Sequence, residues 1–457
     1  MVSLHRRRPV KAARASHTGI PIALELTLSL AMARNIWPSW QTQSLATVAL
    51  AVVVVATSGH WRHLRPAPIA TIAVLTGVGL LGLTTSIATQ ADVARDLANA
   101  LRLCALLAIG LALGTTRSNA VSLARAILWA GLLDAGVHLW DFAMGGGLTV
   151  TAVSALRTEV SKSSVTEVLA LALLMLGGRM MATGPLSTSA RRAALATILS
   201  VSIATYFSRT AIFGLVAILV IASLLKARQT SAGSGPPLDA PRQKGVTSPI
   251  LLITGAAAAL ASIVFVVAPP TLVQQFLTKA ENSIHEILPR PASSRTEITQ
   301  NYRSYESFKA LEAFRQGTDL QHVFGRGWGY PVDLVVDTAS STSDTVRVSA
   351  PILHNGYLEL LVKTGVVGMI VLAAFVLALM RGSLRASRLP EMAGLLGRIS
   401  LGALLVMTFA MVAVRGVMNV QTFNGVMILA AASYGFAMSS RKEGDSWNRT
   451  SAASFRL

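Results

Sequence analysis

The sequence has few charged residues and almost no cysteine for its length. Only 13% of its 457 residues are Asp, Glu, Lys or Arg, whereas 52% are hydrophobic. Soluble domains carry about 25% charged residues, so this balance predicts a membrane protein. The single cysteine, Cys104, lies in an apolar run and excludes a disulfide framework or a cysteine-based metal site.

Motifs for nucleotides and metals are also missing. The sequence contains no P-loop, no Rossmann fingerprint and no His-Glu-x-x-His pattern, so we expect no cofactor, no resident metal and no use of ATP. Asp92 and Asp96, which stand at helical spacing, could bind a cation and are the one weak candidate for such a site. Gly325-Arg326-Gly327-Trp328-Gly329 lacks the strand and helix of a nucleotide site and predicts a turn.

The net charge of +19 comes from basic residues clustered in short segments between apolar runs. In a soluble protein such a charge would suggest nucleic acid. Here the clusters fall on alternate connections, which is the positive-inside pattern of membrane proteins, so we expect no nucleic-acid partner. The pattern favours an even number of spans with both ends of the chain inside the cell. No secretory cleavage site follows the basic N-terminus.

The predicted fold class is an all-α polytopic membrane protein with about twelve transmembrane helices, because a span needs about 20 largely apolar residues. The first candidate span is weak because it contains Glu25. The candidates have these approximate bounds: 20–36, 43–58, 67–87, 97–114, 120–142, 165–182, 191–207, 210–225, 250–268, 356–380, 398–415 and 420–438.

The candidate spans divide the chain into five parts. One connection is far longer than ordinary ones, and such loops are usually functional or disordered. The parts are an inside N-terminal tail (1–19), transmembrane helices 1–9 (20–268), a large outside loop (269–355), transmembrane helices 10–12 (356–438) and an inside C-terminal tail (439–457).

The middle of the large loop predicts an amphipathic helix over 298–314. Aromatic residues and one leucine recur at spacing three: Tyr302, Tyr305, Phe308, Leu311 and Phe314. Charged residues take the other faces: Arg303, Glu306, Lys309, Glu312 and Arg315. Such a helix is expected to lie on the outer membrane surface. Residues 337–349 are rich in Ser and Thr and are expected to be mobile.

Two arginines of the predicted outside region could bind an anion. Arg209 lies between two apolar runs with almost no connection, within Ser208-Arg209-Thr210. It is interpreted either as a membrane anchor or as an anion ligand, because the planar, permanently charged guanidinium suits phosphate oxygens. Arg303 either pairs with Glu306 on a solvated face or joins such an anion site. The residues alone leave both questions open.

His354 and Asn355 stand where the large loop meets the tenth span. Asn is a favoured N-cap, and a His beside it can simply face water. Alternatively, an imidazole titrates near neutral pH and can take a proton from an attacking hydroxyl. Glu359, one turn later, is either a second polar group of the site or an orienting partner. Gly365 and Gly368 are expected to permit close helix packing.

These residues together resemble the family of O-antigen ligases and Wzy-type polysaccharide polymerases. The ligase branch is marked by His, a small polar residue, nine further residues and then Gly-x-x-Gly. His354-Asn355 and Gly365-Val366-Val367-Gly368 match this motif in full. The resemblance is specific over about residues 200–370 and rests on architecture elsewhere.

Two arginines of the family pattern are also matched. The family has one Arg between two spans in a Ser-Arg-Ser/Thr setting, which Arg209 matches. A second Arg opens the helix of the large loop, upstream of a Gly-x-Gly-x-Gly turn, and Arg303 matches it, with Arg295 as the alternative. Family members usually carry an aromatic residue, often Trp, a few residues after this Arg. Tyr305 or Phe308 stands in that place here.

The resemblance implies a metal-independent, membrane-embedded glycosyltransferase that acts at the periplasmic face of the bacterial inner membrane. The implied donor is a glycan on undecaprenyl diphosphate, and the implied acceptor is a sugar hydroxyl of lipid A-core or of another lipid-linked unit. The catalytic residues implied are Arg209, Arg303 and His354. Substrate contacts are expected from four further residues: Asn355, Arg295, Arg326 and Glu359.

An O-antigen ligase of lipopolysaccharide assembly is the favoured function, because the ligase motif is complete. A polymerase of O-antigen or exopolysaccharide is the alternative, since it shares these residues. A polysaccharide transporter or flippase is a third interpretation from a different class. It would place charged residues along a central path, for which Glu25, Arg102 and Asp134 are the candidates within spans.

Overall fold

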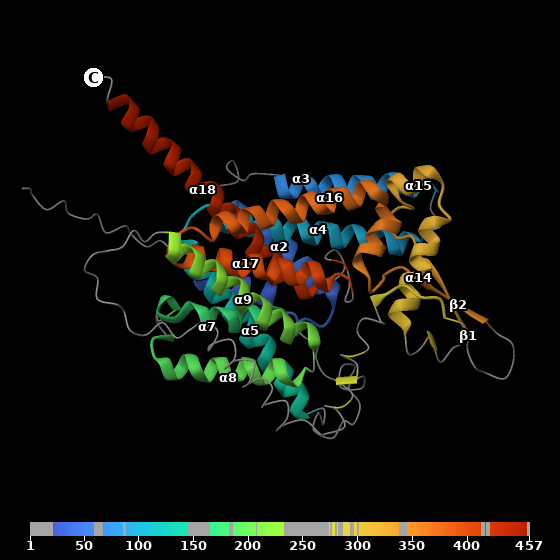
Figure 1. The fold of residues 1–457 in the computed structure, drawn as a ribbon, viewed down its shortest axis with the longest axis horizontal. Helices are drawn as coiled ribbons and strands as arrows, with labels where there is room; N and C mark the ends of the chain where they lie inside the picture. The colour runs from blue at the N-terminus through green and yellow to red at the C-terminus, as the bar shows by residue number, and fades with distance from the viewer. Residues whose placement is uncertain are drawn as a thin grey trace, which may run out of the picture.

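A computed structural model of the chain shows a bundle of long helices with smaller elements gathered at one end (Figure 1). Apart from short stretches between 274 and 298, it describes residues 22–58, 67–85, 88–144, 165–181, 186–206, 208–232, 301–337, 345–412, 416 and 421–454. The bundle helices are α1 (Ile22–Met32), α2 (Trp40–Ser58), α3 (Ala67–Leu81), α4 (Gln90–Leu113), α5 (Asn119–Met144), α7 (Val165–Gly177), α8 (Ser189–Thr205), α9 (Arg209–Ala232), α16 (Gly356–Ala386), α17 (Glu391–Ala410) and α18 (Asn424–Ser454).

Every predicted span except one coincides with a helix of this bundle. The exception, 250–268, lies outside the described residues. Within the described part, 5 helices are long and apolar enough to cross a membrane, and shorter apolar helices accompany them. The helical, multi-pass membrane fold is therefore confirmed, while the count of about twelve spans and the sidedness of the large loop stay predictions. α18 continues past residue 438, where the last span was predicted to end.

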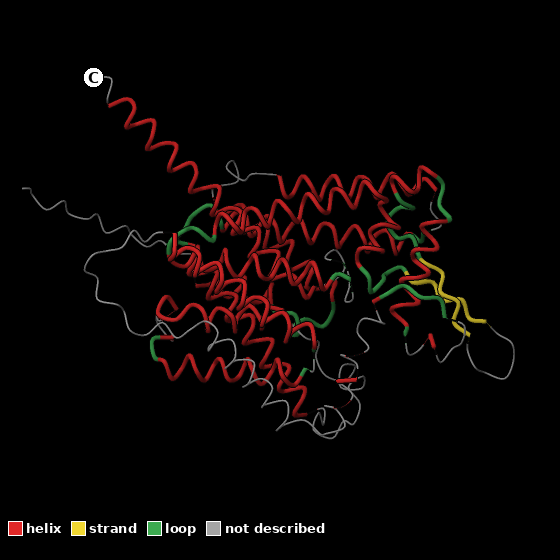
Figure 2. The backbone as a smooth tube through the Cα atoms, in the orientation of Figure 1, coloured by secondary structure: helices red, strands yellow, loops and turns green. Residues whose placement is uncertain are grey.

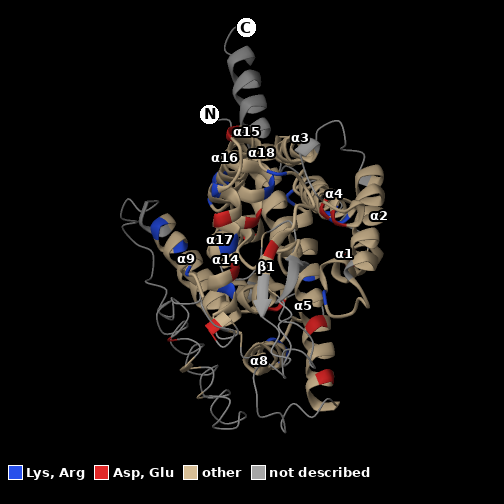
Figure 3. Ribbon diagram, turned by 90° about the vertical axis from the view of Figure 1, so that its right-hand side faces the viewer, with Lys and Arg blue, Asp and Glu red and all other residues tan. Residues whose placement is uncertain are grey.

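Charged residues are sparse on the bundle helices, as Figure 3 shows. The core is a continuous cluster of buried apolar side chains, with Leu107 of α4 and Leu429 of α18 both 0% exposed. α4 and α18 lie against each other, and a Cβ on Gly110 would overlap the carbonyl oxygen of Ile428. Small residues at helix contacts are typical of membrane bundles, where close backbone approach replaces the hydrophobic effect.

The charged residues predicted within spans are buried inside the bundle. Glu25 lies 3.7 Å from a guanidinium nitrogen of Arg125 on α5. Asp134 accepts a hydrogen bond of 2.7 Å from the backbone N–H of Arg34, which follows α1. Arg102 is 1% exposed. Glu25 and Asp134 thus join neighbouring parts of the bundle, which accounts for their burial without a transport path.

The large loop carries a two-stranded antiparallel sheet (Figure 2). β1 (Val332–Asp337) pairs with β2 (Thr345–Ala350), with Val332 opposite Ala350. The all-α prediction is therefore wrong for this loop. The Ser/Thr-rich composition of 337–349 led to the prediction of a mobile segment, although Val346 and Val348 alternate with other residues at the period of a strand.

α14 (Tyr302–Arg315) confirms the helix predicted in the loop, but a different face is buried. The buried residues are Ser304, Tyr305, Glu306, Ser307 and Ala310. Phe308, Leu311 and Phe314 of the predicted apolar stripe are only half-buried. Tyr305 and Ala310 pack in a second apolar cluster with Val332 and Leu334 of β1. The helix docks on the protein through a mixed face, and Glu306 is inside rather than solvated.

The predicted turn over residues 325–329 is confirmed, and it docks the loop onto the bundle just after α15 (Asp319–Phe324). Gly325, Gly327 and Gly329 have φ of +79°, +91° and +76°, in the region that favours glycine. Between them Trp328 is 2% exposed. Its indole N–H donates to the carbonyl oxygen of Thr76 at 2.9 Å. The turn is thus wedged against the end of α3.

α16 is interrupted at Gly365, where φ is +63° and ψ is −164°. Near this interruption the carbonyl oxygens of Val362 and Lys363 accept hydrogen bonds from the backbone of Arg326 and Gly327, at 2.8 and 3.0 Å. A Cβ on Gly365 would also overlap the backbone of Val323. Gly365 therefore receives the docked turn, a more specific role than the helix packing that was predicted.

Candidate functional site

His354 ends the connector (residues 351–355) that joins β2 to α16. Asn355 caps the helix, since its side-chain oxygen accepts from the backbone N–H groups of Tyr357 and Leu358, both at 3.1 Å. The predicted N-cap is therefore confirmed. The N–H of Gly356 donates to the carbonyl oxygen of Met411 at 2.8 Å, which ties the start of α16 to the end of α17.

The carboxylate of Glu306 binds His354 at two points. One oxygen, Oε2, accepts from the backbone N–H of His354 at 2.9 Å and lies 3.0 Å from the ring nitrogen Nδ1. The Glu306 side chain is 2% exposed, whereas that of His354 is 29% exposed. Tyr302, one turn before Glu306, meets the imidazole edge-on with ring centroids 6.0 Å apart. A buried carboxylate thus holds a half-exposed imidazole.

Arg303 lies on the same turn of α14 as these contacts. It follows Tyr302 and precedes Glu306 by three residues, and residues three apart share a helix face. Its side chain is half-buried. The fold therefore brings Arg303 to the end of α14 that contacts His354, although Glu306 and His354 are 48 positions apart in the sequence.

Arg209 opens α9, and the described structure fixes its backbone; its side chain lies outside the described part. A Cβ on Gly214 of α9 would contact Val406 of α17, and one on Gly402 would contact Ile218. These contacts run antiparallel, so the register places Arg209 beside Met411, whose carbonyl oxygen binds the start of α16. Arg209 and His354 thus belong to the same end of the bundle.

The corner before Arg209 is anchored in the bundle core. Tyr206, which caps α8, donates its hydroxyl hydrogen bond to Glu167 Oε1 on α7 at 2.8 Å. Ser202 donates to the other oxygen of Glu167 at 2.6 Å. Tyr206 also stacks on His138 of α5, with ring centroids 3.6 Å apart. These polar contacts hold the α8–α9 corner against two other helices.

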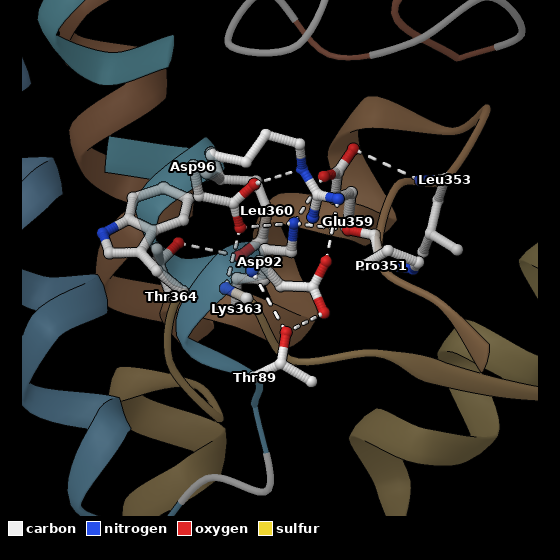
Figure 4. A network of polar contacts seen from close by, with 12 residues as sticks. Thr89, Asp92, Asp96, Pro351, Leu353, Glu359, Leu360, Lys363 and Thr364 are labelled. Atoms are coloured by element: carbon white, nitrogen blue, oxygen red, sulfur yellow. Dashed lines mark hydrogen bonds and ion pairs between the residues drawn. The ribbon is translucent and has the colours of Figure 1, made fainter. Parts of the chain in front are cut away.

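A buried ion network lies beside the connector (Figure 4). The Lys363 ammonium lies 2.7 Å from Glu359 Oε1 and 2.8 Å from Asp96 Oδ2 on α4. The same ammonium donates to the carbonyl oxygen of Pro351 at 2.8 Å, and Glu359 Oε2 accepts from the backbone N–H of Leu353 at 3.4 Å. Buried charges need such partners, and here they attach the connector to α4 and α16.

The structure gives three residues around this network other roles than the sequence predicted. Glu359, expected to contact substrate, is 3% exposed and bound to Lys363, which favours the orienting role. Asp96, considered as a cation ligand, receives the ammonium of Lys363 and the backbone N–H of Gly329 at 2.8 Å. Asp92 binds a guanidinium nitrogen of Arg95 at 2.9 Å. Basic side chains therefore take the place of the predicted cation.

Of the two remaining predicted contacts, one has a partner of its own and the other lies outside the described residues. Arg326 donates to the hydroxyl of Tyr330 at 2.8 Å, and its guanidinium stands 5.0 Å from the Tyr330 ring centroid. Arg326 therefore belongs to the docking turn. Arg295, the alternative loop arginine, lies outside the described residues.

Two important residues were missed by reasoning from the sequence. Glu306 was assigned to a solvated face because the stripe was drawn at spacing three. Tyr302 and Glu306 stand four residues apart and therefore share one face of the helix. This spacing could have shown that the carboxylate lies on the same face as an aromatic side chain. Lys363 was passed over within an apolar span, where a lone ammonium indicates a buried partner.

A search of the curated proteins found no match to the chain. Residues 193–373 match the family model described as O-Antigen ligase. The matched region begins in α8, ends in α16 and includes Arg209, Arg303 and the motif from His354 to Gly368. Over this region the chain is similar to an O-antigen ligase-like family of membrane enzymes, which includes glycosyltransferase-like ligases and polymerases.

Proposed function

We propose that the protein transfers a glycan from undecaprenyl diphosphate to a sugar hydroxyl of lipid A-core. The reaction takes place at the periplasmic face of the bacterial inner membrane, as an O-antigen ligase does in lipopolysaccharide assembly. One observation carries the proposal: within the family-matched region, His354 is half-exposed and held by the buried Glu306 at the end of the bundle where α9 and α14 begin.

The two arginines act on the donor. Arg209 and Arg303 clamp the diphosphate, and their charge offsets the negative charge that develops on the leaving group. Removing one such preorganised interaction typically costs about 3–4 kcal/mol of transition-state stabilisation. The guanidinium fork suits two phosphate groups because it donates in a plane and stays charged. The docking of α14 supports the proposal by bringing Arg303 within one turn of the His354 contact.

His354 acts on the acceptor. The acceptor hydroxyl attacks the anomeric carbon directly, and the imidazole orients this hydroxyl and takes its proton. The sugar–phosphate bond of the donor supplies the driving force, so transfer needs no nucleotide. Asn355 fixes the start of α16 through its cap and thereby the direction in which His354 points.

The test is transfer by purified protein in liposomes that contain the lipid-linked glycan and lipid A-core. We expect wild-type protein to move the glycan onto the core, and Arg303→Ala to lose transfer by about 100-fold or more while staying folded. Arg315→Ala is the matched control, because Arg315 lies exposed at the other end of α14. Wild-type transfer by Arg303→Ala would exclude the diphosphate clamp.

A null strain distinguishes the ligase from the polymerase. Loss of a ligase leaves long polymer on the lipid carrier and bare core. Loss of a polymerase leaves core capped by single repeat units, or no exopolysaccharide. Binding of the lipid diphosphate without any transfer would instead favour a transporter.

A further inference from the structure

We infer that Glu306 is a positioning residue that holds His354 in a single tautomer, with the proton on Nδ1, and so presents Nε2 to the acceptor hydroxyl. This inference rests on the proposed function and deepens it by assigning the state of the base. It concerns a residue that reasoning from the sequence had assigned to a solvated helix face.

The two contacts of Glu306 define the direction of the ring hydrogen bond. A backbone N–H can only donate, so Oε2 accepts from the main chain of His354 at 2.9 Å. The same oxygen lies 3.0 Å from Nδ1. A carboxylate carries no hydrogen and can only accept, so a hydrogen bond between Oε2 and Nδ1 places the hydrogen on Nδ1. In a neutral imidazole Nε2 is then the acceptor nitrogen.

The surroundings of Glu306 match this role. Its side chain is 2% exposed, and burying a carboxylate is costly unless hydrogen bonds compensate it. α14 is held in place near Glu306, because Ser304 Oγ donates to the carbonyl oxygen of Leu288 and the Tyr305 ring is buried in the second apolar cluster. The carboxylate is thus presented to the imidazole from a docked helix, while the imidazole itself stays half-exposed.

A purely structural role for Glu306 is the competing explanation. The connector already has other attachments, since Lys363 binds the carbonyl of Pro351 and Glu359 accepts from the N–H of Leu353. Glu306 adds a contact to the imidazole ring of His354, which a device for holding the backbone would not need. The kinetic test therefore keeps the backbone contact while it removes the charge beside the ring.

With Nε2 of His354 free of hydrogen, every bond and proton in the transfer step can be accounted for. The acceptor oxygen forms a bond to the anomeric carbon as the bond from that carbon to the phosphate oxygen breaks, and undecaprenyl diphosphate leaves with the electron pair. The hydroxyl proton passes to Nε2 of His354. The resulting imidazolium lies against the Glu306 carboxylate, whose negative charge stabilises it. The proton is later lost to water.

The main experiment compares Glu306→Gln with Glu312→Gln in the liposome transfer assay. The glutamine oxygen of Glu306→Gln can still accept both hydrogen bonds, but the charge is gone. We expect kcat to fall by about 100- to 10,000-fold, with little change in KM for the donor. Glu312 is a surface carboxylate of the same helix, paired with Lys309 at 2.7 Å, and Glu312→Gln is expected to keep wild-type kcat.

A spectroscopic readout tests the tautomer itself. In protein labelled with ¹⁵N-histidine, the His354 signal is assigned by its loss in His354→Gln. We expect a protonated Nδ1 and an unprotonated Nε2 in the wild type, and a population with the proton on Nε2 in Glu306→Ala. Formate, which can enter the space left by the side chain, is expected to restore part of the activity of Glu306→Ala but none of that of His354→Gln.

The outcomes separate this inference from the proposed function. If wild-type protein transfers no glycan, the proposed function itself fails. If His354→Gln transfers glycan at the wild-type rate, the function stands, but His354 is not the base and the inference is overturned. If His354→Gln is inactive while Glu306→Gln keeps wild-type kcat and Glu306→Ala keeps the wild-type ¹⁵N spectrum, the function stands and the positioning role is overturned. A loss of kcat in Glu306→Gln with unfolding, and no formate rescue of Glu306→Ala, shows a structural role and also overturns it.

Discussion

Two buried carboxylates on different helices bind the backbone of the connector, and their side-chain partners differ. Glu306 of α14 holds His354, whose side chain is 29% exposed. Glu359 of α16 holds Lys363, which is 3% exposed. A carboxylate with a fully buried cation attaches parts of the fold to one another, whereas a carboxylate behind a half-exposed imidazole leaves one ring nitrogen available for chemistry. Substitutions in the Glu306–His354 pair should therefore lower activity, whereas substitutions in the Glu359–Lys363 pair should lower stability.

His354→Gln should have the largest effect on activity and a small effect on folding. Removing the base and its contact with Glu306 is expected to lower kcat by about 100- to 10,000-fold, with thermal unfolding in detergent near that of wild type. His322→Gln is the control, since His322 binds the carbonyl oxygen of Phe314 on the loop surface at 2.9 Å. Equal losses of activity in His354→Gln and His322→Gln would show that the loss is not specific to the imidazole held by Glu306.

Lys363→Met should damage the fold instead. It leaves Glu359 buried without the ammonium and leaves Asp96 with Arg95, whose Nε lies 3.6 Å from Oδ1. Breaking a buried ion pair typically costs about 3–5 kcal/mol. We expect a much lower thermal unfolding temperature and poor recovery from membranes. Adding Glu359→Gln should recover part of the stability, because it removes the buried carboxylate charge that Lys363 had balanced. If Lys363→Met is as stable as wild type and inactive, Lys363 belongs to the chemistry.

Gly365→Ala should weaken the docking of the loop on α16. The residue has φ of +63° and its Cβ would overlap the backbone of Val323, and such backbone strain costs about 1–3 kcal/mol. Limited proteolysis of the loop should become faster as the 325–329 turn detaches. Gly136→Ala is the matched control, because nothing lies within 4 Å of its added Cβ. Unchanged proteolysis would show that the docking does not depend on Gly365.

Asn355→Ala should have the smallest effect. Losing the N-cap is expected to cost about 1 kcal/mol of stability, with a partial loss of activity because His354 is less well oriented. Asn355→Ser should restore both, since Ser is also a good cap. An inactive Asn355→Ser with normal unfolding would indicate that the amide contacts substrate directly.

Most of the bundle helices and the N-cap of α16 could be predicted from the sequence. Apolar runs of span length located the bundle helices, since lipid requires each span to satisfy its own backbone hydrogen bonds. The Asn355 cap follows from local chain geometry. The β-hairpin and the buried face of α14 could not be predicted in this way, because both depend on what the loop packs against. The sequence pattern predicted that Glu306 is exposed to solvent, whereas tertiary packing buries it against His354.

The amino-acid sequence by itself determined the membrane bundle, the start of α16 and the family motif from His354 to Gly368. These features depend on hydrophobicity, helix capping and spacing along the chain, which are local properties. Only the tertiary structure decided the partners: Glu306 for His354, and Asp96 for Lys363 across 267 residues. The physical reason is that a buried charge is stable only where folding brings a matching group to it, and no local pattern records where that will be.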